Sequence, residues 1–224
     1  MSLGEPREHL PTVGSTNARA RELVGEGATH GTLVTADEQT AGRGRQGRGW
    51  VTPNGVAIAA SLILREFDEL LPLRAGLAVA DVAGPEALVK WPNDVWINGR
   101  KVAGILVEAH NGEWAILGVG VNVAVDPSTL PPDVAAVAGT LGLDPTMIEP
   151  TLAELLIALE RRLGEDRVAS LGALRERDAL LGQSVRWQDG EGIGAGVDDT
   201  GALLVELPDG TTTALSAGEV TLSV

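Results

Sequence analysis

Apolar residues follow two different spacings along the first 181 residues of the chain. Unbroken or alternating apolar runs predict strands, whereas apolar residues three or four positions apart predict helices that bury one face. The predicted strands cover 32–36, 56–64, 95–97, 101–109 and 114–123. The predicted helices cover 69–82, 150–163, 168–181 and a segment that Ser15-Thr16 can cap and that runs to Val24. This mixture of elements predicts an α and β domain over 1–181.

Turn residues divide the chain further. The pairs Asn98-Gly99 and Asn111-Gly112 separate three of the predicted strands, and Asn-Gly is the strongest short-range signal for a tight hairpin. After Gly182, five short apolar runs alternate with glycine-containing turns, which predicts a small all-β domain over 182–224. The expected fold class is therefore α+β, with a mixed sheet and flanking helices followed by a small SH3-like β-barrel.

Composition excludes several classes of function. Thirty-one acidic against 17 basic residues leave a formal charge of −14, which disfavours binding to nucleic acids or anionic membranes. The absence of cysteine excludes disulfides, thiolate zinc sites and thiol catalysis, and the three histidines lack metal-ligand spacing. The N-terminal segment holds no apolar run, so we expect neither a signal peptide nor a membrane anchor, and a cytoplasmic protein.

A basic, glycine-rich loop over 41–50 interrupts this acidic chain. Its Gly42-x-Gly44-x-x-Gly47 pattern matches a dinucleotide-binding fingerprint, but the glycines and proline over 49–55 cannot begin the helix that this fingerprint requires. The loop also lacks the Gly-Lys-Ser/Thr of a P-loop. Four glycines and three arginines remain, which are suited to a flexible loop over an anionic ligand, with a solvated surface loop as the alternative.

The chain has 15 arginines but only two lysines, Lys90 and Lys101, and both fall in one segment. The Asn98-Gly99 hairpin is expected to bring Lys101 back beside Asp94, with Asn93 nearby. Such an ammonium–carboxylate pair is either a surface ion pair of little energetic value or a site for an anion and its metal ion.

These motifs together resemble the biotin protein ligases, the biotin–[acetyl-CoA-carboxylase] ligases of bacteria. The order and spacing of the motifs agree with that family over nearly the whole chain, and the lysine-bearing motif is the most specific. The segments that carry the resemblance are Ser15-Thr16-Asn17, Gln39 to Arg48, Lys90 to Glu108, Gly118 to Asn122 and Ala217 to Val220.

The resemblance implies a catalytic domain like that of the class II synthetases and a set of site residues. The implied catalytic residues are Lys101, Arg45 and Asp94, and Asp94 is also the expected ligand of Mg²⁺ that accompanies ATP. The residues expected at biotin are Ser15, Thr16, Asn17, Gln39, Arg43, Gly44, Arg45 and Gly104. Those expected at ATP and the adenylate are Arg43, Arg45, Trp50, Lys90, Asn93, Lys101 and Asn122, with Trp50 as the candidate for stacking on adenine.

The activity implied is the ATP-dependent conversion of biotin to biotinyl-5′-AMP and its transfer to a lysine of a biotin carboxyl carrier protein. A lipoate or octanoate ligase or transferase of the same fold is the alternative, as is a protein that binds biotin without turnover. The hydroxyl and amide groups of Ser15, Thr16 and Gln39 favour the polar ureido ring of biotin. Because the Ser15 motif comes so early, no DNA-binding domain is expected before it, and no DNA partner.

Overall fold

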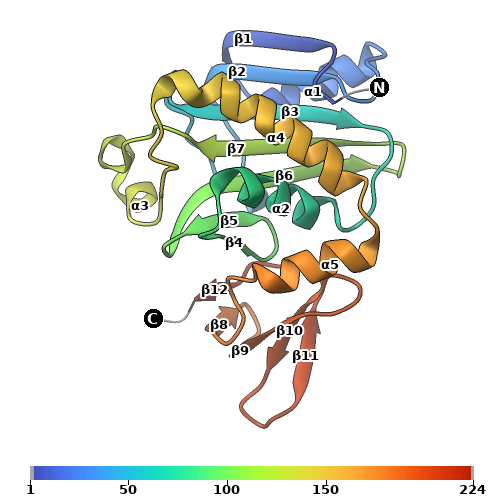
Figure 1. Ribbon diagram of the computed structural model, residues 1–224, viewed down its shortest axis with the longest axis vertical. Helices are drawn as coiled ribbons and strands as arrows, with labels where there is room; N and C mark the ends of the chain where they lie inside the picture. Colours follow the sequence, from blue (N-terminus) through green and yellow to red (C-terminus); the bar gives the residue numbers. More distant parts are fainter. Residues whose placement is uncertain (1–2, 223–224) are drawn as a thin grey trace.

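A seven-stranded mixed sheet forms the centre of the computed structural model, which describes residues 3–222 (Figure 1). The strand order is β1-β2-β3-β7-β6-β5-β4, in which β1 pairs parallel with β2 and all other neighbours are antiparallel. The strands are β1 (Arg7–Val13), β2 (Leu33–Gln39), β3 (Ala57–Leu64), β4 (Ala87–Lys90), β5 (Asp94–Ile97), β6 (Arg100–His110) and β7 (Trp114–Asn122).

Helices cover the two faces of this sheet unequally. Figure 1 shows α2 (Leu71–Ala83) and α4 (Ile148–Leu163) lying across one face, where Leu62 and Leu64 of β3 belong to the large apolar core. The intervening Ile63 points to the opposite face and packs against Ala20 of α1 (Thr16–Gly25). Since α1 contacts β2, β3 and β7, the rest of that second face is left for other segments to cover.

The two Asn-Gly hairpins form as predicted. Asn98 and Gly99 have φ values of 51° and 73°, and Asn111 and Gly112 have φ values of 47° and 75°. Positive φ at both central residues is the geometry of a type I′ turn, which asparagine and glycine tolerate best. These turns fix the register of β5, β6 and β7.

A second sheet follows in the chain, with all its pairs antiparallel and the order β11-β10-β9-β8-β12. Its strands are β8 (Ser184–Trp187), β9 (Gly190–Val197), β10 (Leu203–Glu206), β11 (Thr212–Leu215) and β12 (Thr221–Leu222). The buried Trp91 joins the two sheets, because its indole N–H donates to the carbonyl of Gly201 at 3.0 Å. The predicted fold class, a mixed sheet with flanking helices and a small all-β unit, is confirmed.

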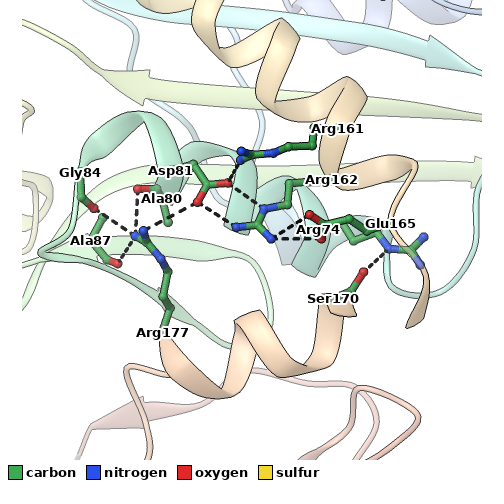
Figure 2. Close-up of polar contacts among 10 residues, drawn as sticks. All are labelled: Arg74, Ala80, Asp81, Gly84, Ala87, Arg161, Arg162, Glu165, Ser170 and Arg177. Carbon is green, nitrogen blue, oxygen red and sulfur yellow. Dashed lines mark hydrogen bonds and ion pairs between the residues drawn. The ribbon is translucent and has the colours of Figure 1, made fainter. Parts of the chain in front are cut away.

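Charged residues fasten the later helices to α2 (Figure 2). Asp81 of α2 accepts hydrogen bonds from Arg161 and Arg162 of α4 and forms an ion pair with Arg177, which follows α5 (Arg167–Glu176). Arg177 also donates to the carbonyls of Ala80 in α2, of Gly84 directly after α2 and of Ala87 at the start of β4. Arg177 thus ties the C-terminal end of α2 to the start of β4.

The structure differs from the sequence-based prediction in one helix boundary and in several elements that were not predicted. Strand β1 was not predicted, because its alternating exposed residues give a weak apolar signal. The helix expected over 168–181 ends at Glu176, since Val89 accepts from and donates to the backbone beyond it. Three single-turn 3₁₀ segments at 45–47, 127–129 and 145–147 and the short α3 (Pro132–Ala135) were also not predicted. Within residues 3–222, no helix has the length and apolarity to cross a bilayer.

Candidate active site

A cavity lies on the second face of the main sheet, between α1 and the loop over 41–50. It forms because this part of the sheet carries very small residues: the register places Ala59 of β3, Gly120 of β7 and Gly104 of β6 side by side. The predicted site residues that line it are Ser15, Thr16, Asn17, Gln39, Arg43, Gly44, Arg45, Trp50, Asn93, Asp94, Lys101 and Gly104. The tertiary structure therefore gathers twelve of the fourteen predicted residues.

Trp50 and Asn17 explain why glycine is needed in the part of the sheet that lies under the cavity. A Cβ atom at Gly120 would lie 2.4 Å from the Trp50 ring, and one at Gly118 would lie 2.3 Å from Oδ1 of Asn17. Both distances are far below van der Waals contact, so any larger residue would displace a side chain that lines the cavity.

One end of the cavity is polar and uncharged. Oε1 of Gln39 accepts from the backbone N–H of Thr16 at 2.9 Å and lies 3.1 Å from the Thr16 hydroxyl. The amide nitrogen of Gln39 donates to the hydroxyl of Thr52 at 3.0 Å, which fixes the orientation of the Gln39 amide. Ser15 is the N-cap residue of α1, but its side chain makes no capping hydrogen bond. The expected hydroxyl cap is thus replaced by Gln39, and Ser15 lines the cavity.

The opposite end is charged. Nζ of Lys101 lies 2.6 Å from Oδ1 of Asp94 and 5.5 Å from the centre of the Trp50 ring. The hairpin brings the two residues together, as predicted: Asp94 pairs with Gly104, and an irregularity between Val95 and Trp96 moves Lys101 toward it. An ammonium with one carboxylate and one aromatic face beside it retains donors for an added anion.

The glycine-rich loop reaches across the cavity to two other parts of the chain. Arg45 donates to Oδ1 of Asn93 and to the carbonyl of Gly218, both at 3.1 Å. Arg48 forms an ion pair with Glu219. Burial lowers the pKa of the Arg45 guanidinium from its usual value. The loop thus rests on the segment before β12 as well as on the main sheet.

Two predicted residues lie outside this cavity. The side chain of Lys90 is buried, donates to the carbonyl of Val220 at 2.6 Å and lies 5.3 Å from the Trp96 ring, and the same burial lowers the pKa of its ammonium. Asn122 donates to the carbonyl of Gly139 at 2.8 Å and lines a neighbouring pocket instead.

That neighbouring pocket shares Trp50 and Lys101 with the first, so the two adjoin at the charged end. Its other wall is mostly apolar and comes from residues 130–138, for which the sequence predicted neither a helix nor a strand. The acidic Asp133 also lines this wall, whose apolar residues are Leu130, Pro131, Val134, Val137 and Ala138. Their apolar character was visible in the sequence, but no periodicity linked them to a site.

Comparison with known proteins supports the resemblance to the biotin protein ligases. Residues 11–124 match the model of the biotin/lipoate A/B protein ligase family, and residues 180–223 match the biotin protein ligase C terminal domain. The biotin–[acetyl-CoA-carboxylase] ligase of Mycobacterium tuberculosis is 38% identical over 92% of this chain and 85% of its own length. The chain belongs to the biotin protein ligase family.

Other members of the family agree in sequence and in structure. The bifunctional ligase/repressor of Bacillus subtilis is 33% identical over 93% of this chain and 71% of its own length. The biotin protein ligase of Aquifex aeolicus, solved with biotin and ATP, superposes with a TM-score of 0.84 at 28% identity over 98% of this chain and 99% of its own. The match at 180–223 distinguishes this biotin ligase from a protein with the shared catalytic domain alone.

Proposed function

We propose that this protein activates biotin with ATP to give biotinyl-5′-AMP and pyrophosphate, and then transfers biotin to a lysine of a biotin carboxyl carrier protein. One observation carries the proposal: a single cavity has an uncharged polar end, a charged end at Lys101 and an adjoining apolar pocket beyond it. Biotin has a polar ring at one end and a carboxylate at the other, and the nucleotide must meet that carboxylate.

The polar end suits the ureido ring. Ser15, Thr16 and Gln39 offer hydroxyl and amide groups there, and Asn17 lies beside them. Such groups reject a ligand without matching polar atoms, because buried donors and acceptors would then be left unpaired. The absent side chains of Gly104 and Gly120 let Trp50 and Lys101 lie directly over the sheet between the polar end and the charged end.

The charged end suits the chemistry of adenylate formation. A carboxylate oxygen of biotin attacks the α-phosphorus of ATP, and the bond from this phosphorus to the bridging oxygen breaks as pyrophosphate leaves. Two anions must approach each other, so Lys101 and Arg45 lower the barrier by supplying fixed positive charge at the point of attack. In the second step, the amine of the carrier lysine attacks the acyl carbon and AMP leaves.

ATP arrives with Mg²⁺, and the donors present fit that ion only in part. Asp94 is the acidic side chain that lines the cavity, and the described residues contain no cluster of three or more His, Asp or Glu. Mg²⁺ characteristically uses one or two carboxylates together with substrate phosphates. Asp94 would hold it with the phosphates, and the ion would neutralise and orient the triphosphate.

The apolar pocket suits the adenine base. Asn122 is one of its lining residues, and Trp50 lines both pockets as the aromatic neighbour. Lys90, which was expected at ATP, is directed instead at the carbonyl of Val220. We assign it a positioning role, in which it holds the segment on which Arg45 rests.

The glycine-rich loop protects the intermediate. Biotinyl-5′-AMP is a mixed anhydride that water hydrolyses, so a loop that closes over bound ligand both completes the site and excludes water. Gly42, Gly44, Gly47 and Gly49 allow this movement, and Arg43 and Arg45 bring positive charge with it.

Incubation of the protein with MgATP, labelled biotin and a biotin carboxyl carrier domain tests the proposal. We expect label on the carrier only when ATP is present, and biotin-dependent exchange of pyrophosphate into ATP without the carrier. Replacing biotin by lipoate or octanoate is the control for the alternative ligase. Tight biotin binding without exchange would instead identify a protein that binds biotin without turnover.

A further inference from the structure

Arginine carries most of the positive charge around the cavity. Arg43, Arg45 and Arg48 of the glycine-rich loop line it, and Lys101 is the one lysine among the described residues that do so. The whole chain holds 15 arginines and two lysines, so the preference extends over the rest of the sequence. Either residue type would attract an anion, but the two differ in how they react with the intermediate of the proposed reaction.

Biotinyl-5′-AMP is a mixed anhydride that acylates amines. The nitrogen of a neutral amine attacks the acyl carbon, and a C–N bond forms as the bond from this carbon to the phosphate oxygen breaks. AMP leaves, and the amine proton passes to solvent. A lysine reacts in this way whenever its amine is unprotonated, whereas a guanidinium stays charged in proteins and has no electron pair available for attack.

Proximity makes this difference large. A group tethered beside a binding site by a short flexible segment acts at an effective concentration on the order of millimolar. A carrier protein at about 10 µM would therefore lose to a lysine on the loop by about a hundredfold, since both acceptors are lysine amines. A loop that closes over the intermediate can thus carry arginine without consuming the biotinyl group, but not lysine.

The two lysines of the chain are both withheld from such a reaction. Lys90 does not line the cavity, is 7% exposed and donates to the carbonyl of Val220 at 2.6 Å. Nζ of Lys101 lies 2.6 Å from Oδ1 of Asp94, and a Cβ atom at Gly104 would lie 3.3 Å from this nitrogen. In the ion pair the Lys101 ammonium is a donor, with no electron pair for the acyl carbon.

We propose that the arginines of the glycine-rich loop determine the acceptor of the biotinyl group, because they supply charge beside the intermediate without offering it an amine. The carrier lysine then has no competitor inside the closed site. The proposal rests on the proposed function and deepens it, since it assigns the selectivity of the second step to Arg43, Arg45 and Arg48.

Arg48→Lys tests the proposal because it keeps the charge and adds an amine to the loop. The Arg48 side chain is 59% exposed and forms an ion pair with Glu219. Arg161→Lys is the matched control: the Arg161 side chain is 58% exposed and pairs with Asp81, but α4 covers the face of the sheet opposite to the cavity (Figure 1). Arg43→Lys adds an amine at a second position of the loop, and Arg48→Gln removes charge without adding an amine.

The measurement is intact-mass spectrometry after incubation with synthetic biotinyl-5′-AMP, with peptide mapping to distinguish the modified residue from the N-terminal amine. With adenylate at about 100 µM, we expect Arg48→Lys to gain a biotinyl group at position 48 at least about tenfold faster than Arg161→Lys gains one at position 161. The rate at position 48 should reach a plateau as the adenylate concentration increases, because the reaction occurs from the bound state. The rate at position 161 should increase linearly.

The wild type and Arg48→Gln should stay unmodified at Lys90 and Lys101 under the same conditions. With biotin, MgATP and a carrier domain, the wild type should label the carrier alone. Arg48→Lys should also label itself at position 48, a result that a merely structural effect of the substitution would not produce.

The outcomes separate this proposal from the proposed function. Bound adenylate that leaves both Arg43→Lys and Arg48→Lys unmodified would overturn the proposal, and so would wild-type Lys101 modified as fast as position 48. Wild-type protein that binds the synthetic adenylate but exchanges no pyrophosphate would overturn the proposed function alone, since this test does not use the first step. A wild type that binds no adenylate would overturn both.

Discussion

Replacement of Lys101 tests the centre of the proposed mechanism. Its ammonium lies between Asp94 at 2.6 Å and the Trp50 ring at 5.5 Å, and the absent side chain of Gly104 makes the room for it. A Cβ atom at Gly104 would lie 3.2 Å from Cε of Lys101 and 3.3 Å from Nζ. Lys101→Arg puts a wider, planar guanidinium into this space. A guanidinium prefers to bind both oxygens of one anion, whereas the ammonium can bind one oxygen from each of two anions.

The expected effects on rate and on stability differ sharply. Loss of a preorganised charge contact made in the transition state costs roughly 3 kcal/mol, on the order of a hundredfold in the rate of adenylate formation. The Lys101 side chain is 28% exposed, so its ion pair with Asp94 contributes at most about 1 kcal/mol to stability after solvent screening. In a chain of this length, that corresponds to a melting temperature lowered by about 2–4 °C or less.

Biotin-dependent pyrophosphate exchange and thermal melting, measured on Lys101→Arg and Lys101→Ala, check both numbers. Arg186→Met is the control for loss of one positive charge, because Arg186 forms an exposed ion pair with Glu191 away from the cavity. We expect both Lys101 variants to lose at least about a hundredfold in exchange rate and Arg186→Met to lose none. Near wild-type exchange by Lys101→Ala would show that this lysine is only a surface charge.

Three further predictions concern other parts of the molecule. Gly120→Ala should displace Trp50, raise the KM for biotin and ATP by about tenfold or more and alter tryptophan fluorescence, whereas Gly172→Ala, with open space at its Cβ, should change neither. Hydrogen exchange over 42–49 should slow when biotin and ATP are both bound, and unchanged exchange would contradict a closing loop. Burial raises the pKa of the Asp178 carboxyl above its ordinary 3.8. Its contribution to stability is therefore fully present below pH 3.8 and is lost as the pH rises through the pKa of the folded state. Urea unfolding at a series of pH values should show this loss in the wild type and not in Asp178→Asn, and parallel curves would refute the assignment.

Local sequence features were sufficient to predict most of the elements and the charged end of the site. The Asn98-Gly99 turn dictated a hairpin because only a few residues adopt positive φ without strain, and this hairpin brought Lys101 to Asp94. The apolar run over 56–64 predicted the fully buried β3, because an unbroken apolar run with the length of a strand is visible in the sequence itself. The resemblance to biotin ligases supplied the roles of the residues.

Tertiary structure alone decided which side chains share protons and charges. Asn17 and Glu108 are 91 positions apart, and they meet only because α1 packs across the strands that carry Ser61 and Gly118. Likewise, the ammonium of Lys90 has a position in the sequence that suits ATP, yet it is directed at Val220, 130 positions away.

The physical reason is the range of the interactions involved. Turn preference and apolar spacing act between neighbours along the chain, so a sequence displays them directly. The direction of a hydrogen bond depends on which donor and acceptor face each other once the sheet has formed. Strand register decides which groups face each other. The sequence by itself therefore determined most of the elements, the loop and the reacting groups of this ligase, whereas only the folded chain decided which partners Asn17 and Lys90 meet.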